Sequence, residues 1–149
     1  IGEKKYQHAR AYAERFVKLS ILLGIGSAVI ILLSSQMIIM VMAMTPLTKD
    51  YLRFMMCVMA YYAVAQTLDE TVIVGIFRSG GDTRFGLIID LTAMWGCSVL
   101  LGAAAAFVFH CSVPVVYALL MSDELVKIPI IWGRYKNCSW IRNITREIE

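Results

Sequence analysis

Residues 78–84 read Arg-Ser-Gly-Gly-Asp-Thr-Arg and lie between two long apolar runs, 54–77 and 85–109. Two successive glycines are poor residues for a helix interior, because each loses much backbone freedom when it is ordered. Arginines on both sides suit a tight turn at a membrane surface. The stretch predicts a polar turn between two membrane helices, and its motif residues are Arg78, Gly80, Gly81, Asp82, Thr83 and Arg84.

The composition around this turn is that of a membrane protein. Of the 149 residues, 59% are hydrophobic and only 17% are charged, and the mean hydropathy is +0.69. In soluble domains, roughly a quarter of all residues are charged. Residues 19–48 and 91–122 contain no Asp, Glu, Lys or Arg, and uncharged runs of this length are typical of membrane helices. We therefore predict an all-α, polytopic membrane protein.

The apolar runs predict four transmembrane helices between residues 19 and 132. The uncharged stretch 91–122 is too long for one crossing, so residues 110–114 form a turn, with Pro114 in the first turn of the fourth helix. Thr48 or Asp50 is expected to cap the second helix. The predicted spans are about 20–44, 54–77, 85–109 and 114–132.

Charged segments flank the four spans. Residues 1–18 show helical spacing of apolar residues and form an amphipathic segment, which either lies along the membrane surface or extends the first helix. Residues 133–149 form a basic tail. Twelve of the fourteen Lys and Arg residues fall in the two terminal parts, the 78–84 turn and the end of the fourth span. The positive-inside rule then places both termini and this turn in the cytoplasm.

Polar side chains within the second and third spans are the main functional signal, because ionisable groups inside a membrane usually face a cavity or a partner. The expected cavity residues are Tyr62, Gln66, Asp69, Glu70 and Asp90. Asp90 lies at a depth similar to that of Asp69 and Glu70, so one cluster is expected to contain Asp90 and either of the other two. Crowded carboxylates readily take up a proton or a cation. The alternative is that these acids bond to helix backbones or pair with arginines.

Other chemistry finds little support. No Ser/His/Asp or Cys/His arrangement is present, so no catalytic residue, enzyme activity or cofactor is expected. The four cysteines share no metal or redox spacing, and no metal site is expected. The net charge is +3, and the Lys and Arg residues lie at the ends of the apolar runs. This distribution argues against nucleic acid as a partner. In the turn, the arginines are expected to set orientation, and Asp82 to cap the third helix.

The turn and its flanks resemble the MATE (multidrug and toxin extrusion) transporter family. The resemblance rests on residues 75–85, on Ile89-Asp90-Leu91 and on Trp95. Weaker similarity covers Ile1-Gly2 with the following alanines, Tyr51-Leu52-Arg53, Asp123-Glu124-Leu125 with Lys127, and the stretch 134–140. Family members have a similar Arg-x-x-Gly-Asp-Thr turn between their tenth and eleventh helices.

The resemblance implies that the chain is the last third of a twelve-helix, two-lobe transporter in the cell membrane. The family exports cationic or amphiphilic compounds in exchange for Na⁺ or H⁺, and some members bind the coupling ion at an acid in the tenth helix, the region of Asp69 and Glu70. The implied partners are the bilayer, the remaining N-terminal helices and small cationic or amphiphilic substrates. Two alternatives stay open, a related lipid or polysaccharide flippase and a non-transporting membrane scaffold or anchor.

Overall fold

The structure, a computed structural model, describes residues 6–141, and this range contains helices and turns but no strand. Three of the helical segments are wide π-helical turns, in which backbone bonds reach five residues instead of four. The elements are α1 (Tyr6–Val41), α2 (Pro46–Glu70), η1 (Thr71–Phe77), α3 (Thr83–Ala93), η2 (Met94–Val99), α4 (Leu100–Ala103), η3 (Ala104–Val108), α5 (Val113–Leu120) and α6 (Asp123–Lys136).

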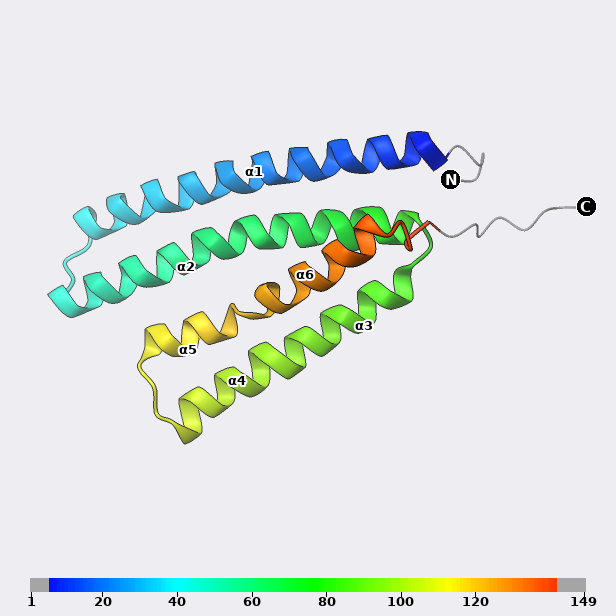
Figure 1. Ribbon diagram of the computed structural model, residues 1–149. Coiled ribbons are helices and arrows are strands. Elements are labelled where there is room, and N and C mark those ends of the chain that lie inside the picture. The colour runs from blue at the N-terminus through cyan, green and yellow to red at the C-terminus, as the bar shows by residue number, and fades with distance from the viewer. Residues whose placement is uncertain (1–5, 142–149) are drawn as a thin grey trace, which may run out of the picture.

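The elements form a bundle of four rods (Figure 1). The first rod is α1, the second is α2 with η1, the third runs from α3 to η3, and the fourth consists of α5 and α6. The fourth rod contacts both the second and the third, because α5 and α6 each touch α2 while α6 also touches α3 and α5 touches α4. The start of α1, the end of α6 and the turn before α3 lie at the same end of the bundle (Figure 1).

Two of the rods are long and apolar enough to cross a membrane. These are α1, with 36 residues, and the continuous helix from Thr83 to Val108, with 26 residues. The helix α1 runs unbroken through residue 19. Its residues before this point therefore form a polar extension of the first span. The second and fourth rods carry the buried charged side chains Asp69, Asp123, Glu124 and Lys127, and these rods lie alongside the two apolar ones (Figure 1).

Close packing of α1 against α2 depends on a glycine. A Cβ at Gly24 would lie 3.1 Å from the Cα of Val64, so the two backbones approach each other closely at this point. Ala60 and Ala65 of α2 are also buried. Small residues at such contacts let helices associate in lipid, where packing and not the hydrophobic effect holds them together.

The expected caps and spans need two corrections. The second helix begins at Pro46, and Thr45, not Thr48 or Asp50, is its N-cap, with its side chain accepting a bond from the backbone N–H of Thr48. Proline fits the first turn because its missing N–H has no partner there in any case. The fourth span, expected as one helix, consists of α5 and α6 with a break at Met121 and Ser122.

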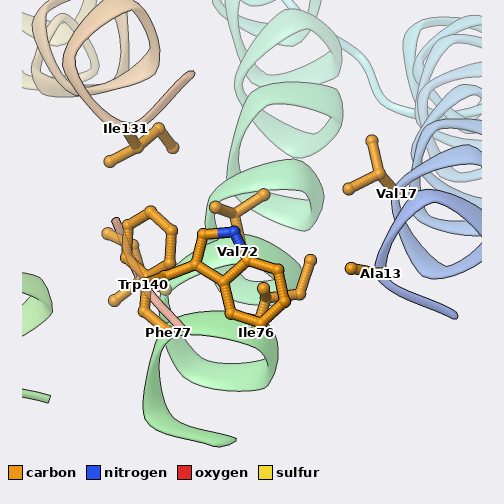
Figure 2. Close-up of a cluster of buried hydrophobic side chains, with 8 residues drawn as sticks. Ala13, Val17, Val72, Ile76, Phe77, Ile131 and Trp140 are labelled. Atoms are coloured by element: carbon orange, nitrogen blue, oxygen red, sulfur yellow. The ribbon is translucent and has the colours of Figure 1, made fainter. Parts of the chain in front are cut away.

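The buried apolar cluster lies at the end of the bundle where α1 begins and α6 ends. Ala13 and Val17 of α1 face Val72 and Ile76 of η1, and Ile131 and Trp140 close the cluster from the α6 side (Figure 2). Phe77 has no exposed surface. The cluster fixes the end of α6 against the second rod and so sets the height at which the charged side chains of α6 meet α2 and α3.

Candidate functional site

Lys127 of α6 lies among four carboxylates that come from three helices. Its Nζ is 2.7 Å from Oε1 of Glu124 and 2.9 Å from Oδ2 of Asp69. Oδ1 of Asp90 is 3.3 Å away and Oδ2 of Asp123 is 3.7 Å away. Asp69 lies on α2, Asp90 on α3, and the other two acids in the first turn of α6. The ammonium group therefore connects three of the four rods.

This arrangement leaves negative charge unbalanced. Four carboxylates surround one ammonium group, which has only three N–H donors. Asp69, Asp123 and Glu124 are buried, and in each of them one oxygen has no hydrogen-bond partner among residues 6–141: Oδ1, Oδ1 and Oε2, respectively. Burying an unpaired charge costs several kcal/mol even after relaxation. Protons or additional cations would relieve this cost, which makes the cluster a candidate site for both.

The cluster forms one wall of a hollow of about 280 Å³. All five cavity residues that the sequence predicts line this hollow: Tyr62, Gln66, Asp69, Glu70 and Asp90. The sequence leaves open whether Asp69 or Glu70 is the partner of Asp90. In the structure, Asp69 and Asp90 both contact the ammonium group of Lys127. Glu70 lines the hollow, but it is exposed and makes no ion pair within the described range. The role of these residues in transport stays a prediction.

The break between α5 and α6 lies beside the cluster. The carbonyl of Leu120, at the end of α5, accepts a 2.6 Å hydrogen bond from the hydroxyl of Ser98 on the third rod. After Met121 and Ser122, α6 begins, and Asp123 and Glu124 occupy its first turn. Acidic groups are favoured there, because the N-terminus of a helix carries partial positive charge. Broken helices at membrane depth occur where backbone lines a protein cavity, and they often form ion sites in transporters.

Asp123, Glu124 and Lys127 belong to the site but are not among the residues that the sequence predicts for it. The spacing of Asp123 and Lys127 suggests a self-contained i,i+4 pair, but this is the longest of the four contacts that Lys127 makes. A signal for the break was present, because Ser122 before two acids is a typical helix start. The contacts of Lys127 with α2 and α3 have no signal in the sequence of α6 itself.

The glycine turn has a structural role at the other end of α3. Asp82 occupies the N-cap position of α3 but makes no side-chain cap bond, which corrects the expectation from sequence. Its Oδ2 instead accepts a 2.5 Å hydrogen bond from Nε of Arg134, whose guanidinium lies 4.1 Å from the centre of the Phe85 ring. Asp82 is buried among its neighbours, so its carboxylate is used to attach α6 to the turn.

Both glycines of the turn are required by the backbone. Gly81 has a φ of 87°, a conformation that side chains other than glycine rarely adopt. A Cβ at Gly80 would clash with the backbone oxygen of Trp140. The other motif residues are exposed: Arg78, Thr83 and Arg84. This exposure is compatible with the expected contact of the two arginines with lipid headgroups.

Within residues 6–141, no three His, Cys, Asp or Glu side chains are arranged to hold a metal ion as they stand. In the carboxylate cluster, the position between the acids is taken by the Lys127 ammonium. A metal cation would need this ammonium group to move away, whereas a proton would not.

Comparison with known proteins identifies the family of the chain. The family model MatE matches residues 1–104, which include Asp69, the glycine turn and Asp90, while the matched range ends before α5 and α6. Neither the comparison with curated proteins nor that with solved structures found a match. The family match covers more than half of the chain. The chain therefore belongs to the MatE family, the multidrug and toxin extrusion family of membrane transporters.

Proposed function

We propose that the chain is the C-terminal part of a cation-coupled multidrug efflux antiporter, which exports cationic or amphiphilic compounds by alternating access. The observation that supports this proposal is the cluster of four carboxylates around Lys127 inside a bundle of the MatE family. A cluster built only for stability would be expected to balance its charges, because unpaired buried charges are costly. An excess of acids suits a site that takes up and releases positive charge.

Uptake of positive charge would act on the contacts that Lys127 makes. In the unloaded state the ammonium group holds α2 and α3 to α6 through Asp69 and Asp90. A proton on Asp69 or Glu124 would remove the negative charge that attracts Lys127 and weaken this connection. The short helix α6 would then be free to tilt at the break next to Ser122. Such a tilt would open the hollow to one side of the membrane and close it to the other.

Of the two coupling ions that the family uses, the proton fits this cluster better. The Lys127 ammonium already occupies the space between the carboxylates, and a second full cation beside it would be repelled. The three unpartnered carboxylate oxygens are positions where a proton can bind without displacing the ammonium group. Coupling to Na⁺ would require Lys127 to leave first. No cofactor has a role in this scheme.

We also propose the membrane, the topology and the partners that the family resemblance implies. The protein works in the cell membrane, with both ends of the segment and the glycine turn in the cytoplasm. The remaining helices of the transporter complete the cavity, because one lobe cannot enclose a substrate. Substrates are small cationic or amphiphilic compounds. The fit of the family match to residues 1–104 supports the transporter class, and the antiport mechanism is our inference.

The test uses the full-length protein that contains this chain, reconstituted in liposomes. A fluorescent organic cation is the substrate, and either a pH gradient or a Na⁺ gradient is imposed. We expect the pH gradient to drive export, and Asp69→Asn or Glu124→Gln to reduce gradient-driven export at least tenfold. Asp50→Asn, at the far end of α2, is the control and should retain export.

Three outcomes would contradict parts of this proposal. Normal export in both cluster variants would remove the cluster from the mechanism. Export of a labelled lipid or polysaccharide, and not of the organic cation, would favour the flippase. A failure of the native protein to move any substrate across the liposome membrane would favour the scaffold or anchor.

A further inference from the structure

A second hollow, about 370 Å³ in volume, lies at the end of the bundle where α1 begins and α6 ends. One wall is the N-terminal part of α1, and the other is the end of α6 with the residues that follow it. Its lining combines cations with aromatic rings: Arg10, Lys18, Lys136, Trp132, Tyr135 and Trp140. This hollow is separate from the carboxylate cluster, which lines a different cavity.

The charges in this hollow favour an anion. Three cations line it, against the single acid Glu14. Arg10 and Glu14 are 3.6 Å apart on the surface of α1, and both side chains are more than half exposed. Exposed pairs of this kind are weak and easily rearranged. Lys18 and Lys136, one from each wall, make no ion pair within the described residues and leave the hollow with net positive charge.

Two neutral donors add to these cations. Trp140 is only 2% exposed, and its Nε1 has no hydrogen-bond partner among residues 6–141. A buried N–H without an acceptor is rare in folded proteins and indicates a missing partner. The ring is held in place by the apolar cluster around Phe77 (Figure 2). It also lies in close contact with Gly80. Burial raises the pKa of the Tyr135 phenol and Glu14 raises it further, so that its hydroxyl remains a donor at neutral pH.

The position of the hollow distinguishes a lipid from a free anion. Tryptophan and tyrosine gather where membrane helices reach the interface, and here they lie at the end of the apolar part of α1. The hollow also includes Val17 and Ile21, and the exposed apolar face of α1 continues from there through Leu22 and Ile25. A molecule with an anionic head and long apolar chains would use both surfaces at once.

We propose that this hollow binds the phosphate headgroup of an anionic phospholipid at the end of the bundle where α1 begins and α6 ends. Lys18 and Lys136 hold the phosphate oxygens from two sides, and the acyl chains lie along α1. Basic pockets between membrane helices are known to attract such headgroups. The bound lipid connects α1 with the end of α6. The site does not depend on the carboxylate cluster or on the antiport mechanism.

The experiment measures the thermal unfolding of the purified full-length protein in detergent, with phosphatidylglycerol, phosphatidylcholine or inorganic phosphate added. Phosphatidylglycerol is expected to raise the unfolding temperature by about 3–5 °C, because a ligand that binds only the folded state stabilises it. Phosphatidylcholine, which has no net charge, and inorganic phosphate should give less than a third of this shift.

Variants then locate the site. Lys18→Gln with Lys136→Gln should weaken phosphatidylglycerol binding about 30-fold, since each cation near the surface contributes roughly fivefold. The matched control is Lys49→Gln with Arg53→Gln, which removes the same charge near the opposite end of α2 and should retain the full shift. Trp140→Phe keeps an aromatic ring, removes the N–H and should reduce the shift by at least half.

Each result decides for or against the proposal. Equal shifts with phosphatidylcholine and phosphatidylglycerol, or a full shift in the double lysine variant, would overturn it. An equal shift with inorganic phosphate would replace the lipid with a free anion. If Trp140→Phe lowers the unfolding temperature without lipid, the double lysine variant alone decides, because its two exposed side chains lie outside the buried cluster.

Discussion

Two cations attach α6 to the rest of the bundle, the buried Lys127 and the half-buried Arg134, and they do so in opposite ways. Arg134 meets the carboxylate of Asp82 and stacks on Phe85, next to the glycine turn. Lys127, about two helical turns earlier in α6, meets four carboxylates, three of which keep an oxygen without a partner in the described residues. The first arrangement holds a turn together. The second has more negative than positive charge and borders a hollow, and we propose it as the site that takes up and releases positive charge.

The guanidinium and ammonium groups suit these two tasks. A guanidinium is planar and presents donors in a fixed geometry, which suits a permanent attachment to one carboxylate. An ammonium group is compact, rotates freely and can shift among several acceptors. We therefore expect the Arg134 region to respond to mutation through stability, and the Lys127 region to respond also through pH and transport.

The largest effect is expected for Lys127→Met. The change leaves four carboxylates facing each other without a cation, and removal of one partner of a buried ion pair costs about 3–5 kcal/mol. The folded variant should bind protons more tightly than the unfolded chain, so its stability should fall as the pH rises and approach that of the native protein at low pH. Thermal unfolding of the full-length protein between pH 5 and 8 is the measurement.

Two further variants test the cause of this loss. In Lys127→Met combined with Asp69→Asn, one of the repelling charges is removed, and part of the lost stability should return. Lys49→Met removes a cation near the start of α2 and should change the unfolding temperature little. A Lys127→Met protein with native stability at every pH would mean that the ammonium group is not the counter-ion of the cluster.

A smaller effect is expected for Asp82→Asn. The substitution removes the charge that Arg134 meets, and hydrogen bonds to charged groups contribute about 1.5–3 kcal/mol. Because Arg134 is 26% exposed, we expect a loss near the lower end of that range. The pH dependence of export should not change, in contrast to Asp69→Asn. If Asp82→Asn alters the coupling while stability is retained, the division between the two regions is wrong.

Gly80→Ala tests the turn itself. Its new methyl group would clash with Trp140, and overpacking of this kind costs about 1–3 kcal/mol. Gly75→Ala is the matched control, since a Cβ there meets nothing within 4 Å and the residue lies within a helical segment. Alanine at this position should stabilise the protein by about 0.5–1 kcal/mol. Chemical denaturation of both variants compares them, and equal effects would contradict the close approach of Trp140.

The smallest effect is expected for Ser98→Ala. Loss of the hydroxyl leaves the Leu120 carbonyl without its donor, and one such bond contributes about 0.5–1.5 kcal/mol. The variant tests whether the helix break is coupled to the carboxylate cluster. If it is, a double-mutant cycle with Glu124→Gln should show non-additive changes in export rate. Additive changes would indicate that the helix break and the acids act independently.

Much of the fold could be predicted from the sequence, because membrane insertion is read from local composition. The apolar runs place the helices, and the double glycine with flanking arginines places the turn between the second and third rods. The apolar runs do not show how a helix continues or breaks. The sequence leaves open whether residues 1–18 extend the first helix, and it predicts one helix where α5 and α6 are separate. Caps and breaks depend on single side chains such as Ser98, whose partner is 22 residues away.

The site could be predicted only in part. Asp69 and Asp90 lie on the two helices that the glycine turn joins. The number of residues between each acid and the turn gives its depth, because the helical rise per residue is constant. The two depths are similar, so the acids are expected to lie close together. Lys127 belongs to a third helix with no such common reference. Its height relative to α2 is set by the packing of Ile131 and Trp140 at the end of the bundle. The link between these acids and Lys127 is therefore a tertiary property.

The sequence by itself determined that the chain is an all-helical membrane protein, where its polar turn lies and which spans carry acids. These properties follow from hydropathy and from the backbone freedom of glycine, both of which act over a few neighbouring residues. The tertiary structure decided which acids share a cation, why Gly80 must lack a side chain, and where α6 begins. These depend on the rotation and height of each rod against the next, because an ion pair forms only when two side chains from different helices reach the same point.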